Sequence, residues 1–313
     1  MIKQWLFYAT VLLTCAISVC IPVVQSIAES ANTALQQEFV IEDYEKGYWL
    51  YEDLSQSLQI EINRYEITEK ELLWYEADIR TSEQTPLQFF PANEESPGKG
   101  FKYAERIARD NRLVFAVNDD QFGHRLYNRK TMGVVVRNGK VMSNKTMRSG
   151  NVALPNLDVG VFFPDGSMQV FESKDHTGEE YIAMGAQNVL SFGPYILREG
   201  EINPSFQKYY RHREPRCAVG MVEPYHYVVI VVEGRSARAQ GVGLQWVGER
   251  MQELGVRQAI NLDGGHTSCI VFMGRKLEIS NPLGKVLKAR SLSGMIGLGN
   301  SERVPAYEGL EKR

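Results

Sequence analysis

The sequence contains little cysteine and histidine: 313 residues include 4 cysteines and 5 histidines. Cys15 and Cys20 lie inside an N-terminal apolar run, so Cys217 and Cys269 are the pair that remains outside it. Two cysteines are too few for a disulfide scaffold, although one bridge between them is open. Their spacing also gives no C-x-x-C, which excludes a thioredoxin-like redox site and a zinc knuckle of that type.

Signatures of several large enzyme classes are absent as well. The sequence has no G-x-S-x-G, no H-E-x-x-H and no P-loop, and Gly241-Val242-Gly243 lacks the third glycine and the strand context of a dinucleotide fold. Lysine and arginine form no basic block, and the formal net charge is -3. We therefore expect no cofactor and no nucleic-acid partner.

An uncharged apolar run extends from Gln4 to Ala28. A bilayer is spanned by about 20 residues, so this run predicts a transmembrane helix within residues 1–28. Lys3 precedes the run, and the positive-inside rule then places the rest of the chain outside the cytoplasmic membrane. The alternative is a cleaved signal peptide ending near Ser26-Ile27-Ala28, in which case the protein is secreted.

The remaining residues are expected to form one main domain. Residues 29–56 are acidic and polar, with a weak helical spacing, and predict a stalk. Residues 57–300 predict an α+β domain built on a mixed, largely antiparallel sheet with a few helices, and residues 301–313 predict a C-terminal tail. The sequence indicates no oligomeric state.

Alternating and helical patterns predict the elements of this domain. The expected hairpins pair 58–62 with 73–79, 134–137 with 140–142, 159–163 with 168–171, and 221–222 with 227–232. Single strands are expected at 113–117, 195–198 and 258–262, and helices at 103–111, 179–189 and 244–254.

A first group of candidate site residues, Asn118-Asp119-Asp120, directly follows an apolar strand. Two adjacent carboxylates in this position could supply a general base, a nucleophile or ligands for a hard cation. The alternative is an Asx-rich turn in which these side chains only accept hydrogen bonds from backbone amides.

A second group follows the strand predicted at 258–262. It consists of Asn261, Asp263, Gly264, Gly265 and His266. The asparagine and the aspartate project to the same side of the strand end, and the glycines allow a ligand to approach the backbone amides closely. The alternative is a tight Asp-Gly hairpin that joins this strand to the next one.

Two further candidates are arginines at strand ends. Arg216 lies in Pro215-Arg216-Cys217-Ala218-Val219-Gly220, and Arg235 ends Glu233-Gly234-Arg235 after the most apolar strand. A guanidinium in such a place can bind a phosphate bidentately, or it can pair with a carboxylate. We expect Asn118, Arg216, Arg235 and Asp263 to converge on one site.

Together these segments resemble the phosphodiester glycosidase family. The most specific match is Ala259-Ile260-Asn261-Leu262-Asp263-Gly264-Gly265-His266-Thr267-Ser268, which is similar to the family's N-L-D-G-G-G-S-S signature. Residues 232–235 resemble V-D-G-R, residues 215–220 resemble P-R-T-A-V-G, residues 191–194 resemble S-F-G-P, and residues 116–122 resemble A-I-N-G-G-Y-F. The resemblance covers residues 58–299.

The resemblance implies hydrolysis between the anomeric carbon of a sugar and a phosphodiester, without a cofactor. It makes Asp263 the first candidate for the catalytic carboxylate, followed by Asp119, Asp120 and Glu233. The substrate-binding candidates are Asn118, Arg216, Arg235, Asn261, Gly264, Gly265 and His266.

The sequence departs from the family pattern at several of these positions. Asp119-Asp120 replace the glycines, His266 replaces the third glycine of the signature, Glu233 replaces an aspartate and Cys217 a threonine. The shape of the pocket and the substrate are therefore expected to differ from those of other members.

Two other classes of function fit the same residues. A glycan-binding or envelope-assembly module without catalysis could use the same pocket. A metal-dependent phosphodiesterase would instead use Asp119, Asp120, Asp263 and His266 as ligands and cleave the P–O bond.

Overall fold

The computed structural model describes residues 38–127, 133–145, 157–278 and 290–307. The predicted membrane segment at 1–28, the first part of the expected stalk and the end of the expected tail lie outside the described residues. Within the described ranges, no helix is both long and apolar enough to cross a bilayer.

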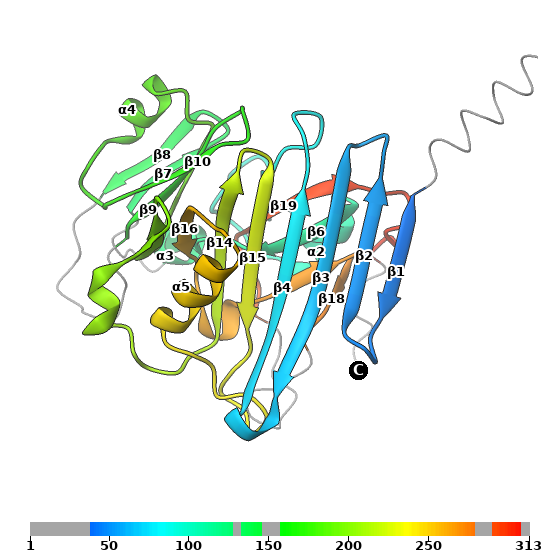
Figure 1. Cartoon of the computed structure of the whole chain (residues 1–313). Helices are drawn as coiled ribbons and strands as arrows, with labels where there is room; N and C mark the ends of the chain where they lie inside the picture. The colour runs from blue at the N-terminus through cyan, green and yellow to red at the C-terminus, as the bar shows by residue number, and fades with distance from the viewer. Residues whose placement is uncertain (1–37, 128–132, 146–156, 279–289, 308–313) are drawn as a thin grey trace, which may run out of the picture.

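A nine-stranded sheet is the largest element of the fold (Figure 1). Neighbouring strands run antiparallel in every described pairing of this sheet, as the prediction of a largely antiparallel sheet requires, but the parallel pairings of the predicted mixed sheet do not occur among them. In spatial order the strands are β1 (Phe39–Asp43), β2 (Tyr48–Asp53), β3 (Leu58–Ile67), β4 (Leu72–Arg80), β15 (His226–Val232), β14 (Arg216–Glu223), β16 (Gln258–Asn261), β12 (Tyr195–Arg198) and β13 (Glu201–Ile202).

The stalk and tail predicted at the two ends of the domain were wrong where the structure describes them. β1 and β2 fall inside the expected stalk, and Trp49 and Tyr51 of β2 are fully buried. Aromatic residues at every second position favour a half-buried strand, and this signal outweighs the weak helical spacing. At the other end, Val304 packs into the main core and Ser301 Oγ donates to Glu38 Oε2 at 2.6 Å. The domain therefore extends beyond 57–300 on both sides.

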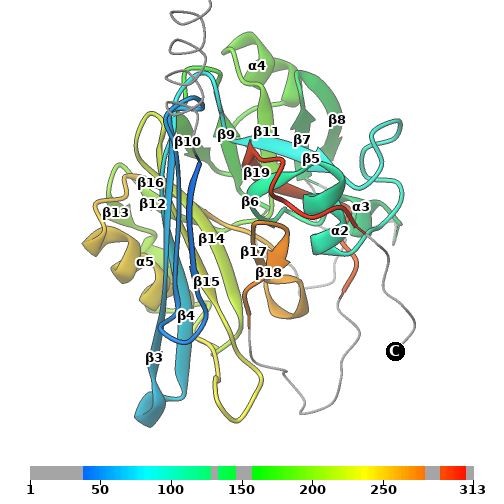
Figure 2. The same cartoon turned by 90° about the vertical axis from the view of Figure 1, so that its right-hand side faces the viewer.

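Alternation along β4 shows how the large sheet separates two cores. Leu73, Tyr75 and Ile79 lie in the main core, whereas Leu72 and Trp74 lie in a second core on the opposite face. The second core is covered by helix α5 (Leu244–Glu253), and the main core is closed by a second sheet on the other side (Figure 2). Because both faces are buried here, residues 72–75 form an uninterrupted apolar run, and polar residues alternate with apolar ones only from Glu76 onward.

Two five-stranded antiparallel sheets complete the fold. The sheet against the main core consists, in spatial order, of β18 (Arg275–Lys276), β17 (Ile270–Phe272), β6 (Leu113–Asn118), β19 (Gly294–Asn300) and β5 (Gln88–Pro91). The other consists of β10 (Met168–Phe171), β9 (Val159–Phe162), β11 (Asn188–Ser191), β7 (Gly133–Arg137) and β8 (Lys140–Lys145). The four predicted hairpins, β3–β4, β7–β8, β9–β10 and β14–β15, are confirmed.

Few helices accompany the sheets, as predicted. They are α2 (Ala104–Asp110), α3 (Phe122–Tyr127), α4 (Gly178–Ala183) and α5, with short 3-10 turns η1 (Thr68–Lys70), η2 (Pro204–Gln207) and η3 (Gly265–Thr267). The helix expected at 179–189 was too long. It begins with a capping box between Thr177 and Glu180 and ends before Gly185, whose φ of +96° cannot continue a helix. The apolar residues after it form β11.

The passage β15–α5–β16 is the strand-helix-strand unit expected from the sequence. β14 lies between β15 and β16 and is antiparallel to both, so β15 and β16 end at the same edge of the large sheet. Arg216, the first residue of β14, is therefore at this edge, paired with Val232. This edge carries most of the candidate residues.

Candidate active site

Asn118 joins the ends of two strands from different sheets. Its Nδ2 donates to the backbone carbonyl of Asp263 at 2.8 Å, and its Oδ1 accepts from the amide of Cys269 at 3.0 Å. The amide of Asp263 in turn donates to the carbonyl of Asp119 at 3.4 Å. The ends of β6 and β16 are thereby fixed side by side, which brings the two predicted groups of polar residues together.

The hairpin alternative for the glycine-rich segment is wrong. β16 belongs to the nine-stranded sheet, whereas β17 pairs with β6 in the second sheet. The segment Asp263-Gly264-Gly265-His266 therefore connects two sheets and runs through η3. Its residues are positioned by both layers of the fold.

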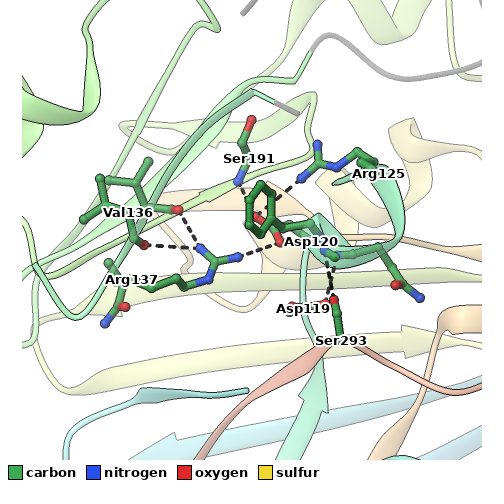
Figure 3. A network of polar contacts seen from close by, with 12 residues as sticks. Asp119, Asp120, Arg125, Val136, Arg137, Ser191 and Ser293 are labelled. Carbon is green, nitrogen blue, oxygen red and sulfur yellow. Dashed lines mark hydrogen bonds and ion pairs between the residues drawn. The ribbon is translucent and has the colours of Figure 1, made fainter. Parts of the chain in front are cut away.

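Asp120 is the centre of a buried ion-pair network (Figure 3). Arg137 Nη2 donates to Asp120 Oδ1 at 2.7 Å, Arg125 Nη2 lies 3.6 Å from Asp120 Oδ2, and the amide of Ser191 donates to Oδ2 at 2.7 Å. Burial alone would raise the pKa of Asp120, but the two guanidinium groups outweigh it and hold this pKa below its ordinary value. The amide of Phe122 also donates to Oδ1, so the predicted Asx turn is present as well. Asp120 is thus an anion with its charge compensated by arginine.

Asp119 is in a different electrostatic state from its neighbour. Its Oδ1 accepts from the amide of Gln121 at 2.8 Å, whereas its buried Oδ2 has no hydrogen-bond partner among the described residues. Burial, and next the negative charge of Asp120, raise the pKa of Asp119 to about 8. Near pH 7 this carboxyl group holds a proton.

Asp263 is partly buried, between Thr267 and two arginines. Burial raises the pKa of its carboxyl group, and a hydrogen bond with Thr267 and the charges of Arg290 and Arg125 oppose that rise. A hydrogen bond from the backbone of Gly264 also lowers this pKa. Asp263 therefore combines low exposure to water with nearby cations that favour its charged form.

The two glycines after Asp263 pack against the loop that precedes β14. A Cβ atom at Gly264 would lie 2.7 Å from the carbonyl oxygen of Pro215, and the amide of Gly265 donates to the same oxygen at 3.1 Å. Gly265 also has a φ of +63°, which a side chain would strain. The amide of Gly265 is thus engaged within the protein, and the prediction that it is open to a ligand was wrong.

The arginines predicted to bind phosphate lie on the loops next to these glycines. Arg216 donates from Nε to the carbonyl of Val242 at 3.1 Å and from Nη2 to the carbonyl of His212 at 3.0 Å. Burial lowers its pKa to about 10, so it remains charged at neutral pH. Arg235 Nε donates to Glu214 Oε2 at 2.7 Å, and its Nη1 lies 3.4 Å from Nδ1 of the exposed His266.

Asn261 and Glu233 form hydrogen bonds with other parts of the fold. Asn261 Nδ2 donates to the carbonyl of Gly193 at 2.9 Å and fixes the loop after β11. Glu233 is buried, and its Oε1 accepts from Tyr75 Oη at 3.0 Å. Near it is another buried carboxyl group, Glu278, whose pKa burial raises to about 7. Glu233 therefore belongs to a second acidic group.

The two cysteines and the expected metal ligands are also placed. Cys217 and Cys269 are buried free thiols, so the bridge left open by the sequence is not formed. In the part of the chain that the structure describes, no three His, Cys, Asp or Glu side chains are arranged to hold a metal ion. Of the four ligands of the phosphodiesterase hypothesis, Asp120 is engaged with arginines and His266 is on the surface beside Arg235.

Sequence reasoning missed the cations that surround the carboxylates, namely Arg125, Arg137 and Arg290, and the hydroxyl of Thr267. One signal was present for Arg137, because it ends a strand in which every residue is buried. A charge at such a position requires a buried partner. Arg125 and Arg290 have no comparable signal, since Arg125 lies in the short helix α3 and Arg290 lies outside the described helices and strands.

The fold and the site define a domain built from β-sheets. In it, the carboxyl groups of Asp119 and Asp263 follow the ends of two strands and lie near several arginines. A family model for phosphodiester glycosidase matches residues 111–298, which is more than half of the chain. The chain belongs to the phosphodiester glycosidase family.

Individual relatives are distant. The SPbeta prophage-derived uncharacterized protein YomE of Bacillus subtilis (strain 168) is 26% identical over 175 residues, which cover 55% of this chain and 26% of that protein. The match thus spans about a quarter of the length of that relative.

Two solved structures are similar in fold. The catalytic domain of zebrafish N-acetylglucosamine-1-phosphodiester alpha-N-acetylglucosaminidase, auto-inhibited by its pro-peptide, gives a TM-score of 0.61 at 19% identity, with 80% of this chain and 86% of that chain covered. A hypothetical protein from Synechocystis gives 0.51 at 14% identity, with 77% and 62% covered. At these identities the likeness shows the fold alone.

Proposed function

We propose that this protein hydrolyses the glycosidic bond of a sugar-1-phosphodiester on a surface glycan or glycoconjugate. The products are a reducing sugar and a phosphomonoester. The observation that carries the proposal is the junction of β6 and β16, where Asp119 and Asp263 are joined through the amide of Asp263 and the side chain of Asn118. Membership of the phosphodiester glycosidase family supports the reaction class.

The protonation states suggest a division of labour between the two carboxyl groups. Asp119, with its pKa raised to about 8 by burial, holds a proton near pH 7 and can donate it. Burial raises the pKa of Asp263 above its ordinary value, and the charges of Arg290 and Arg125 oppose that rise; as the anion, Asp263 can activate water or attack the anomeric carbon. When two neighbouring carboxyl groups have different environments, one can act as the general acid and the other as the base or nucleophile.

The leaving group determines how much acid catalysis the reaction needs. A phosphate leaves more readily than an alcohol, so cations and hydrogen-bond donors on the phosphate can provide much of the transition-state stabilisation. Arg125 and Arg290, the arginines that act on Asp263, are suited to that task. The carboxylate of Asp263 then carries the remaining requirement, stabilisation of an oxocarbenium-like transition state.

We also propose that the domain acts outside the cytoplasmic membrane, anchored by residues 1–28. The support is the uncharged run from Gln4 to Ala28 with Lys3 before it. If Ser26-Ile27-Ala28 is instead a cleavage site, the same domain is secreted.

A labelled-water experiment tests the reaction. The purified protein is incubated with a sugar-1-phosphodiester in water enriched in oxygen-18, and the products are analysed by mass spectrometry. Label in the sugar and none in the phosphomonoester is the expected result, because the C–O bond breaks. Label in the phosphate would indicate a phosphodiesterase, and substrate binding without any product would indicate a glycan-binding module.

A further inference from the structure

Arg125 is buried without the partners that a buried guanidinium needs. Its side chain is 3% exposed, and its Nε, Nη1 and Nη2 make no hydrogen bond to any residue that the structure describes. It forms an ion pair with Asp120, whose Oδ2 lies 3.6 Å from Nη2, too far for a hydrogen bond. Buried donors without acceptors are costly, and where native proteins keep them a role for the group is to be sought.

Asp120 does not fully compensate Arg125, because it also serves Arg137. Arg137 Nη2 donates to Asp120 Oδ1 at 2.7 Å, while its Nη1 donates to the carbonyl of Val189, also at 2.7 Å. One carboxylate therefore faces two guanidinium groups (Figure 3). Since Asp119 holds a proton near pH 7, its pKa being about 8, this network carries a surplus positive charge.

Arg290 is a second cation, besides Arg125, that lies near the carboxylate of Asp263. It donates from Nη1 to the hydroxyl oxygen of Thr267 at 3.2 Å and from Nη2 to Nε2 of the His124 imidazole at 3.1 Å, and neither acceptor is an anion. The exposed Arg290 and the buried Arg125 both act electrostatically on Asp263. Asp263 thus has a surface cation and an interior cation beside it.

The arginines on the β14 side are engaged differently. Arg216 uses Nε and Nη2 to bind the carbonyls of Val242 and His212, and Arg235 Nε is paired with Glu214. Their donors therefore already hold loops of the protein together. Among these arginines, Arg125 on the α3 side of Asp263 is the one whose three guanidinium nitrogens make no hydrogen bond to a described residue.

We propose that Arg125 and Arg290 bind the phosphate group of the substrate on the α3 side of Asp263, with Asp120 positioning Arg125. This inference rests on the proposed function and names the residues that recognise its leaving group. A phosphate supplies several anionic oxygens, which match the donors of Arg125 and the charge of Arg290. It also gives a role to Asp119-Asp120, where the family pattern has glycines: the second carboxylate holds Arg125 in place.

Competition by inorganic phosphate tests the assignment in the full-length protein. The variants are Arg290→Gln, which changes an exposed side chain, and Arg125→Lys, which keeps the charge but removes the planar donor pattern. Arg257→Gln is the matched control, because Arg257 is exposed and pairs with Glu199. The inhibition constant of phosphate and the rates on a sugar-1-phosphodiester and on an aryl glycoside without phosphate are measured for each.

The expected result is a rise of about 10-fold or more in the phosphate inhibition constant for Arg290→Gln and Arg125→Lys, as loss of one charge-assisted contact predicts. The preference for the phosphodiester over the aryl glycoside falls by a similar factor, and the control keeps both values. Unchanged phosphate inhibition in Arg290→Gln overturns the proposal, even if Arg125→Lys fails to fold. A larger effect in Arg216→Ala than in Arg290→Gln also overturns it.

Failure of the proposed function is separable from failure of this inference. If the wild-type protein releases no sugar from either substrate, the hydrolase proposal fails. Binding of inorganic phosphate is then measured by calorimetry on the wild type and on Arg290→Gln. This measurement tests the proposed phosphate-binding site independently of any catalytic activity. Loss of binding in the variant supports the site, and equal binding refutes it.

Discussion

The side-chain amide of Asn118 donates a 2.8 Å hydrogen bond to the backbone carbonyl of Asp263, a residue 145 positions later in the chain. This bond links the end of β6 in one sheet to the end of β16 in another. Its consequence is that Asp119 and Asp263, which no local pattern relates to one another, share one site.

Replacing Asp263 with asparagine should abolish turnover without unfolding the protein. The amide keeps the shape of the side chain but removes the charge that activates water or stabilises the oxocarbenium ion. We expect kcat to fall by at least about 100-fold to 1000-fold, measured as sugar released from a sugar-1-phosphodiester. Asp165→Asn, in the exposed β9–β10 turn, is the control and should retain activity. Wild-type rates in Asp263→Asn at an unchanged melting temperature would transfer the role to Asp119.

Replacing Asp120 with asparagine should destabilise the fold strongly. Arg137 and Arg125 would then be buried without a counter-charge, and breaking a buried ion pair on one side costs about 3–5 kcal/mol. Urea unfolding measures the change in free energy. Asp110→Asn is a matched control, because Asp110 pairs with Lys102 and Arg106 at the surface. That variant should lose no more than about 1 kcal/mol, and equal losses in the two variants would contradict the buried network.

The raised pKa of Asp119 predicts a pH dependence of stability. Between the ordinary pKa of 3.8 and about 8, the folded protein holds a proton on Asp119 that the unfolded chain has released. The contribution of this group is therefore fully present below pH 3.8 and is lost as the pH rises toward 8, with a slope of at most about 1.4 kcal/mol per pH unit.

Asp119→Asn should remove that contribution. Unfolding free energies of the wild type and the variant, measured across this pH range, should then diverge with pH. Glu278→Gln is a useful comparison, since burial raises the pKa of Glu278 from 4.5 to about 7 and its contribution is lost as the pH rises between these two values. Parallel curves for the wild type and Asp119→Asn would show that Asp119 ionises normally.

The N-terminal apolar run predicts that the domain is outside the cytoplasmic membrane. Protease added to intact spheroplasts should digest it, while a cytoplasmic marker protein survives. Digestion in the pellet fraction indicates the anchor, and digestion or recovery in the medium indicates cleavage near Ser26-Ile27-Ala28. Complete protection of the domain would contradict the predicted topology.

Local pattern was sufficient for most of the strands. β4 and its partner β3 were predicted correctly, because apolar residues at every second position define a buried face of a strand. The same reasoning failed at β2, where a helical spacing was preferred although Trp49 and Tyr51 alternate with more exposed residues. The helix predicted at 179–189 was too long. Its end at Gly185 depends on a backbone angle, and a glycine in the sequence is only a weak signal for that angle.

The sequence by itself determined which residues end the buried strands, and with them the candidates Asn118, Asp119 and Asp263. It also carried the family signature around Asp263. Only the tertiary structure decided that Asp120 is bound by two arginines while Asp119 keeps a proton, and that Glu233 belongs to another group. The physical reason is that charge state depends on burial and on partners distant in sequence. Local periodicity fixes which way a side chain points along a strand, but it contains no information on which charges the packing of separate sheets brings together.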